Sequence, residues 1–121
     1  MSLRAYQQAA TRAETPRDTE FRLFSQVTLA LVEASRLDSR DLAGRVPALD
    51  WNRRLWSVLA LDCGNPGNQL PKELRAGIIS LSIWVNKYTS DVIRGQDDIQ
   101  DLIDVNRMIM QGLSSRSEGA A

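Results

Sequence analysis

A segment rich in turn-forming residues divides this chain, and it constrains the fold more than any other feature. Residues 64–71 read Gly-Asn-Pro-Gly-Asn-Gln-Leu-Pro, and an apolar-rich run at residues 74–93 follows them. Glycine, asparagine and proline interrupt regular elements. Proline also suits the first position of a helix, because it has no N–H to leave unpaired. The pattern therefore predicts a helix that begins at Pro71, ends at Arg94 and is closed by Gly95, with a length of roughly 36 Å.

Large apolar residues follow a regular spacing along this predicted helix. Steps of four and three residues connect Leu70, Leu74, Ile78, Leu81, Val85, Tyr88 and Val92. Ile79, Ile83 and Trp84 widen the apolar face beyond that stripe. A helix that is apolar on more than one side either lies at the centre of a bundle or serves both a core and a partner. We therefore expect one long central helix.

The rest of the chain also has helical periodicity, and no segment alternates as a strand would. Further helices are predicted over residues 3–13, 16–37, 48–62 and 98–112. Pro16, with an acid at Asp18, marks a helix start. Gly44 and Pro47 predict an irregular stretch before residue 48, and Gly64 is suited to a left-handed helix end. The sequence thus predicts an all-α bundle of about five helices.

Chain length indicates a single domain, which we place at residues 1–113. The small polar tail at residues 114–121 is expected to be disordered. Fifteen basic and fifteen acidic side chains cancel, which argues against generic nucleic-acid binding. The first residues contain no apolar signal core, and no run is long enough to span a bilayer. We expect a cytoplasmic protein without membrane insertion.

No constellation of residues predicts catalysis, a cofactor or a metal site. The chain contains no histidine, which is the commonest general base and metal ligand. Its one cysteine, Cys63, has no partner for a disulfide and no histidine to activate it. The loop at residues 65–68 lacks the lysine or hydroxyl residue of a phosphate loop. Two acidic pairs, Asp97 with Asp98 and Asp101 with Asp104, fall on the polar side of the last predicted helix, where solvated carboxylates are expected. We therefore predict that the protein is not an enzyme.

Two polar features leave alternatives open. Trp51 and Trp56 flank two arginines, as on some RNA-binding surfaces, but five residues separate them, so a buried Trp56 and a more exposed Trp51 are favoured. Asn106 interrupts the apolar stripe of the last helix. It either binds a partner's backbone or is hydrogen-bonded inside the core, for example near Asn68.

Apolar surface also exceeds what one small core needs. The surplus residues are Leu3, Tyr6, Val46, Leu49, Trp51, Ile79, Ile83, Ile93, Val105 and Met108. They predict either a groove for another helix or a bundle that encloses them all.

Three blocks of sequence carry a resemblance to a known family. They are residues 68–76 (Asn-Gln-Leu-Pro-Lys-Glu-Leu-Arg-Ala), 78–85 (Ile-Ile-Ser-Leu-Ser-Ile-Trp-Val) and 102–113 (Leu-Ile-Asp-Val-Asn-Arg-Met-Ile-Met-Gln-Gly-Leu). With them, residues 5–6 and 15–17 closely resemble the FlaF family of small flagellar proteins, over residues 3–113. The residues of this chain that fall in the family blocks and that we single out are Asn68, Leu70, Pro71, Leu74, Arg75, Asn106 and Arg107.

The resemblance implies that the chain is needed for flagellin to be made and exported, and members look like flagellin-specific secretion chaperones. It implies flagellin as the partner, beside a companion regulator of flagellin translation or a component of the export apparatus. The alternative is a post-transcriptional regulator of flagellin expression that acts with that companion. No catalytic residues are implied. Our candidate partner-binding residues are Ile79, Ile83, Trp84, Val105 and Met108.

Overall fold

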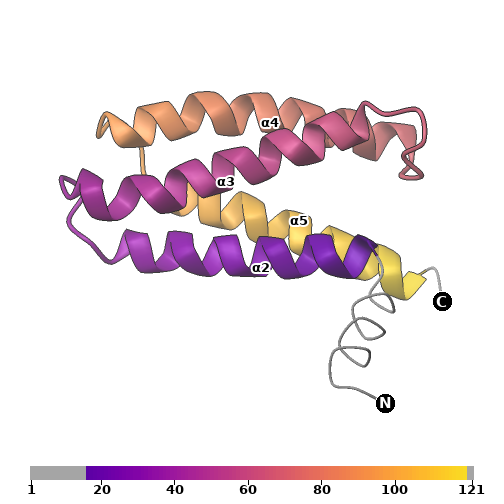
Figure 1. Cartoon of the computed structure of the whole chain (residues 1–121), viewed down its shortest axis with the longest axis horizontal. Helices are drawn as coiled ribbons and strands as arrows, with labels where there is room; N and C mark the ends of the chain where they lie inside the picture. The colour runs from indigo at the N-terminus through magenta and orange to yellow at the C-terminus, as the bar shows by residue number, and fades with distance from the viewer. Residues whose placement is uncertain (1–15, 120–121) are drawn as a thin grey trace, which may run out of the picture.

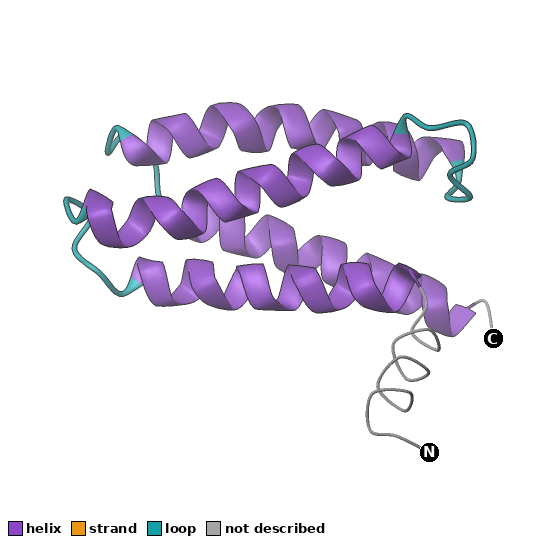
Figure 2. Cartoon of the chain, in the orientation of Figure 1, coloured by secondary structure: helices purple, strands orange, loops and turns teal. Residues whose placement is uncertain are grey.

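The computed structural model describes residues 16–119, and within them the side chains of residues 18–112 (Figures 1 and 2). This part of the chain contains four helices, which are α2 (Pro16–Ser35), α3 (Leu42–Cys63), α4 (Lys72–Ile93) and α5 (Gln100–Gly119), and it contains no strand. The all-α prediction is confirmed. The described residues form four helices where the sequence predicted about five, and the predicted helix at residues 3–13 lies outside them.

The four helices pack side by side with short connections between them, so that consecutive helices run in opposite directions (Figure 1). α3 packs on α2 and α4, α2 also packs on α5, and α4 meets α5 only sparsely. The helix predicted at 71–94 is present as α4, but it is not the central helix of the bundle. α4 has 22 residues, as many as α3, and it packs mainly on α3. α4 is not central because only part of its widened apolar face is buried in the core.

α3 begins at Leu42, six residues before the predicted start at residue 48. The predicted irregular stretch at Gly44 and Pro47 is helical, because two features offset the helix-breaking residues. The carboxylate of Asp41 accepts a hydrogen bond from the N–H of Gly44 at 3.0 Å and caps the first turn. Pro47 removes one intrahelical hydrogen bond, but its neighbour Leu49 is fully buried in the core.

The helix ends around the turn-forming segment differ slightly from the prediction. Pro71 is the N-cap of α4, with an extended ψ of 148°, and not its first helical residue. Gly95 has a φ of +76° and closes α4 as predicted. Gly64 has a φ of −79°, so the predicted left-handed position is wrong. Its N–H bonds to the carbonyls of Ala60 and Leu61, which continues the right-handed turn.

The remaining boundaries differ by one or more residues. α2 ends at Ser35, two residues before the predicted end. α5 begins at Gln100, two residues after the predicted start, and the Asp98 carboxylate accepts a hydrogen bond from the Gln100 N–H at 2.9 Å. The helix continues to Gly119, past the predicted end at Gly112. The division into a domain at 1–113 and a tail at 114–121 stays a prediction.

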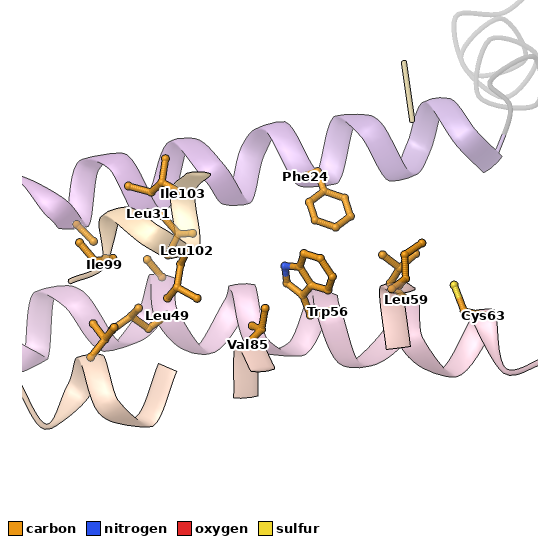
Figure 3. Packing of buried hydrophobic residues seen from close by; sticks show 14 of the residues in the cluster. Phe24, Leu31, Leu49, Trp56, Leu59, Cys63, Val85, Ile99, Leu102 and Ile103 are labelled. Atoms are coloured by element: carbon orange, nitrogen blue, oxygen red, sulfur yellow. The ribbon is translucent and has the colours of Figure 1, made fainter. Parts of the chain in front are cut away.

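The core lies along the middle of the bundle and draws on all four helices (Figure 3). Its centre is the edge-to-face contact between Phe24 of α2 and Trp56 of α3, with ring centroids 5.5 Å apart. Trp56 has no exposed surface, whereas Trp51 is 42% exposed. Both outcomes agree with the prediction for the two tryptophans of α3.

Candidate functional site

A buried polar cluster joins three helices at the centre of the core. The side-chain oxygen of Asn106 (α5) accepts a hydrogen bond from the indole N–H of Trp56 (α3) at 2.9 Å. Its amide nitrogen donates to Thr28 of α2 at 3.1 Å and to the side-chain oxygen of Asn52 of α3 at 2.8 Å. Asn106 and Asn52 are fully buried. The cluster fixes the rotation and height of α5 against both neighbours, because any slip would leave buried polar atoms unpaired.

The prediction that Asn106 is hydrogen-bonded inside the core is therefore confirmed. Its partners are Trp56, Thr28 and Asn52, however, and not the loop near Asn68. The role of Asn52 was not predicted from the sequence. Asn52 lies four residues before Trp56, and residues at that spacing share a helix face. A polar residue at that spacing from a predicted core tryptophan was the available signal.

α4 and α5 touch at a cluster near the turn that connects them. The hydroxyl of Tyr88 donates to the carboxylate of Asp101 at 2.5 Å, and it also lies 3.0 Å from the carbonyl oxygen of Asp98. Partial burial and the Asp101 carboxylate raise the pKa of the Tyr88 hydroxyl above its usual range. Trp84 stacks on Tyr88, with ring centroids 4.5 Å apart. From this cluster, α5 runs away from α4 toward α2 (Figure 1).

Three of the predicted partner-binding residues border this side. Trp84 lies one helical turn before Tyr88, on the side of α4 that faces α5. Val105 and Met108 lie four and seven residues after Asp101, which touches Tyr88, so they share its face of α5. Trp84 and Val105 are half-buried, and Met108 is 63% exposed. We call Leu81, Trp84, Tyr88, Val105 and Met108 the α4–α5 surface.

The other two predicted residues lie on a different side of α4. Ile79 is three residues before Ser82, whose hydroxyl donates to the carbonyl of Trp56 in α3 at 3.3 Å. Ile79 is half-buried on this side, and Ile83, one turn further on, is 69% exposed. We call this pair the α3–α4 edge. The five candidates therefore form two surfaces and not one.

The family-block residues at the start of α4 have structural contacts. The amide of Asn68 donates to the carboxylate of Asp62 at 2.9 Å, and its oxygen accepts the N–H of Leu70 at 3.0 Å. Leu70 is buried and Leu74 is half-buried against the core. These contacts connect the loop to the end of α3 and set where the next helix begins, directly after Pro71.

The two arginines in the family blocks make few side-chain contacts with the described part of the chain. Arg75 is half-buried, and its Nε has no hydrogen-bond partner. Arg107 is exposed and makes no hydrogen bond or ion pair with another residue of the described chain. Arg107 therefore does not order the bundle through side-chain contacts among the described residues, because its helix position points it to solvent. A role for Arg107 toward a partner stays a prediction.

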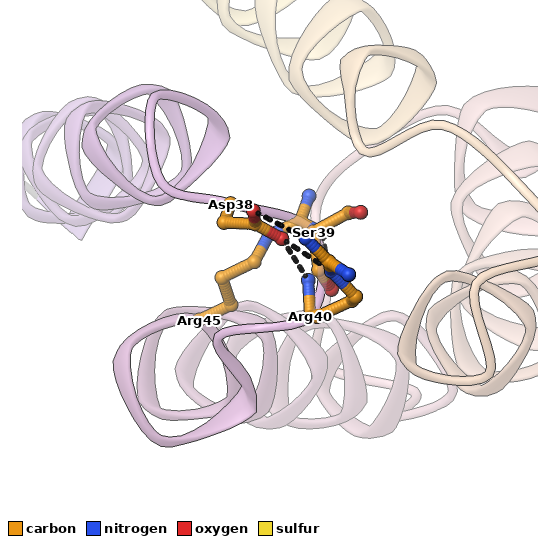
Figure 4. Close-up of polar contacts among 4 residues, drawn as sticks. All are labelled: Asp38, Ser39, Arg40 and Arg45. Carbon is orange, nitrogen blue, oxygen red and sulfur yellow. Dashed lines mark hydrogen bonds and ion pairs between the residues drawn. The ribbon is translucent and has the colours of Figure 1, made fainter.

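A cleft of about 720 Å³ lies at the end of the bundle where the α2–α3 and α4–α5 connections meet. Arg45 lines it and is only 6% exposed, and its guanidinium donates to the carbonyl of Ser39 at 3.3 Å (Figure 4). Hydrogen bonds from Arg40, with the charge of Arg45, lower the pKa of the Asp38 carboxyl. The burial of Arg45 was not predicted from the sequence, because Gly44 and Pro47 indicated an irregular stretch there.

The acidic pairs of the last helix are exposed and make local contacts. Asp98 accepts a hydrogen bond from the backbone N–H of Gln100, Asp101 accepts one from Tyr88, and Asp104 accepts one from the Gln100 side-chain amide at 2.9 Å. Within residues 16–119, no group of three or more His, Cys, Asp or Glu side chains could hold a metal ion. None of the four described helices combines the length and apolar content that crossing a bilayer needs.

Comparison with known proteins places the chain in a family. The model of the family described as flagellar protein FlaF matches residues 2–113. No curated protein and no solved structure matches the chain. The family match covers nearly all residues, including the three blocks at 68–76, 78–85 and 102–113. The chain therefore belongs to the FlaF family of flagellar proteins, whose role lies in flagellar biogenesis.

Proposed function

We propose that this protein is a cytoplasmic chaperone, without catalytic activity, that binds unassembled flagellin and supports its synthesis and export. The observation that carries the proposal is the α4–α5 surface. There Met108 is largely exposed, Trp84 and Val105 are only half-buried, and the two helices are sparsely paired. An amphipathic helix of a partner can complete such a surface by packing its apolar side between two helices.

The charge of the protein supports an apolar mode of binding. Acidic and basic side chains balance over the chain, so no net charge steers a partner of either sign. Contacts between desolvated apolar side chains are screened little by salt. Binding of flagellin is therefore expected to weaken only slightly as the ionic strength rises.

The experiment is a pull-down of full-length and terminally truncated flagellin by the protein and its variants. Met108→Asp places a charge on the α4–α5 surface, and Leu29→Asp is the matched control, because Leu29 is 59% exposed on α2. We expect Met108→Asp to lose flagellin while its circular dichroism stays that of the parent, and Leu29→Asp to keep it. A folded Met108→Asp variant that still retains flagellin would remove the α4–α5 surface from the proposal. Failure of the parent to retain any flagellin would refute the chaperone function itself.

A second candidate function is post-transcriptional regulation of flagellin expression, together with a companion translation regulator. The α3–α4 edge favours it, because Ile83 is 69% exposed on a side of α4 separate from the α4–α5 surface. Two separate surfaces allow flagellin and a regulator to be held at the same time. Ile83→Asp would then release the regulator and keep flagellin in the same pull-down. Loss of flagellin from Ile83→Asp would instead place the flagellin contact at this edge.

A further inference from the structure

A groove runs between the outer sides of α2 and α3. Its volume is about 460 Å³, and it is lined by Ala30, Glu33, Ala34, Leu37, Gly44, Pro47, Ala48 and Trp51. Small residues from both helices leave the space open between the larger side chains of Leu37 and Trp51, which are 41% and 42% exposed. Most of this lining is apolar, so water in the groove gains few hydrogen bonds, and an apolar occupant would release it.

The apolar surface continues from the groove along α3. Leu55 and Val58 follow Trp51 by four and seven residues, so they lie on the same side of the helix. Leu55 is half-buried, and Val58 is 64% exposed. α2 and α3 are antiparallel, so this stripe leads from the groove toward the end of the bundle where α2 begins at Pro16. The uncovered surface therefore extends toward the point where the preceding segment joins α2.

We propose that the segment before α2, residues 3–13, folds back as a helix and packs along the α2–α3 groove of its own chain. Length supports this occupant. If the chain turns back at residues 14–15, a helix over residues 3–13 places Leu3 about 15 Å back along α2, and Ala30 lies about 21 Å after Pro16, at the helical rise of 1.5 Å per residue. Leu3 would therefore lie within about one helical turn of Ala30 and Trp51, at the near end of the groove.

The pattern of the segment matches the stripe. Its apolar residues Leu3, Tyr6, Ala10 and Ala13 are spaced by three, four and three, which places them on one face of a helix. The segment would run antiparallel to α2 and therefore parallel to α3. Tyr6 then falls near Leu55 and Val58 once Leu3 lies near Trp51. The two large side chains of the segment thus cover the two most exposed large apolar side chains of the stripe.

Charge also favours this occupant. Glu33 is the only charged residue that lines the groove, and it makes no ion pair with another residue of the described chain. The segment carries Arg4 at the end that would reach the groove, and its side chains sum to two positive charges, from Arg4 and Arg12. Arg4 would therefore meet an acidic side chain at the groove wall.

The first experiment uses Trp51 as the reporter, in the full chain. Acrylamide quenching is compared between each protein and its Trp51→Phe counterpart, so that the difference isolates Trp51 from Trp56 and Trp84. In Leu3→Asp/Tyr6→Asp, two charges are placed on the apolar face, and we expect Trp51 to lose protection. The matched control, Gln8→Asp/Thr11→Asp, adds the same charge to the opposite face, and Trp51 should keep its protection. Equal quenching of Trp51 in all three backgrounds would overturn the proposal.

The second experiment tests whether the occupant comes from the same chain. A cysteine pair at Leu3→Cys and Ala30→Cys is oxidised, with Leu3→Cys and Ile83→Cys as the control pair on the far helix. The natural Cys63 is 1% exposed, so it competes little. We expect an intramolecular disulfide with the first pair and none with the control. A covalent dimer from the first pair would mean that a second copy fills the groove. Equal yields of intramolecular disulfide from both pairs would mean that the segment has no fixed place. Either result would refute the proposal.

Discussion

The buried cluster around Asn106 allows a sharp test of how the bundle is specified. Replacing Asn106 with leucine keeps a side chain of similar size but removes all three of its hydrogen bonds, to Trp56, Thr28 and Asn52. The hydroxyl of Thr28 can rotate toward another acceptor. The indole N–H of Trp56 and the side-chain oxygen of Asn52 cannot reach water, because both residues are fully buried.

The expected loss follows from those two atoms. A buried donor or acceptor without a partner costs about 1–3 kcal/mol, so the pair costs roughly 2–6 kcal/mol. The apolar surface of the new leucine offsets about 1–2 kcal/mol of this. We therefore expect Asn106→Leu to lower the free energy of unfolding by about 3 kcal/mol, a large share of the roughly 5–15 kcal/mol typical of a domain. For a domain of this size, the melting temperature should fall by roughly 10–20 °C.

Urea unfolding followed by circular dichroism measures this loss, and Met108→Leu on the exposed side of the same helix is the control. A double-mutant cycle with Trp56→Phe separates the hydrogen bond from packing. Because phenylalanine lacks the N–H, Asn106→Leu should cost less in that background, by about 1–2 kcal/mol. A loss below about 1 kcal/mol for Asn106→Leu in the parent protein would show that the cluster does not determine stability.

Three further outcomes follow from the contacts. Pro71→Gly should lower the free energy of unfolding by about 1 kcal/mol, because glycine leaves the unfolded chain more freedom. Glycine is tolerated at the N-cap position that Pro71 occupies, so the folded state should change little. An equal or higher melting temperature would count against this. The pKa of the Tyr88 hydroxyl is raised in the folded protein, so the unfolded chain loses the hydroxyl proton at lower pH. The stabilisation that the protonated hydroxyl gives is therefore lost as the pH rises above about 10. Tyr88→Phe should lose less stability than the parent in alkaline solution, and equal losses would contradict the raised pKa. Arg107→Ala should leave the melting temperature within about 2 °C of the parent, because the side chain is exposed and unpaired within the described residues; any role of Arg107 must then appear as weaker flagellin binding in a pull-down, and unchanged binding would leave it without a role.

The helices with regular apolar spacing were predictable from sequence, and so was the burial of Trp56. Periodicity reports which residues share a face, and packing then follows from the number of such faces. The start of α3 was not predictable in this way. Gly44 and Pro47 disfavour a helix locally, and the contributions that outweigh them come from the cap at Asp41 and from the buried Leu49. Local propensity is a weak guide where tertiary contacts decide.

The candidate surface was only partly predictable for a related reason. The sequence shows that α4 is apolar on more than one side, but it does not show which neighbour covers each side. Ile79 and Trp84 were assigned to one face. Five residues separate them, and consecutive helical residues are turned by about 100°, so they lie well apart around the helix axis. The contacts of Ser82 with α3 and of Tyr88 with α5 assign the two sides.

Stability and partner binding are expected to be separable on α5, because the two depend on different faces of one helix. Asn106 faces α2 and α3 and has no exposed surface, whereas Met108, two residues later, is 63% exposed. Two residues correspond to a rotation of about 200°, so the two side chains point in nearly opposite directions. A change at Asn106 therefore acts on the register of the bundle, and a change at Met108 acts on the α4–α5 surface with little effect on the core. If Met108→Asp unfolded the protein as severely as Asn106→Leu, the α4–α5 surface would belong to the core, and the docking site for a partner helix would have to lie on another side.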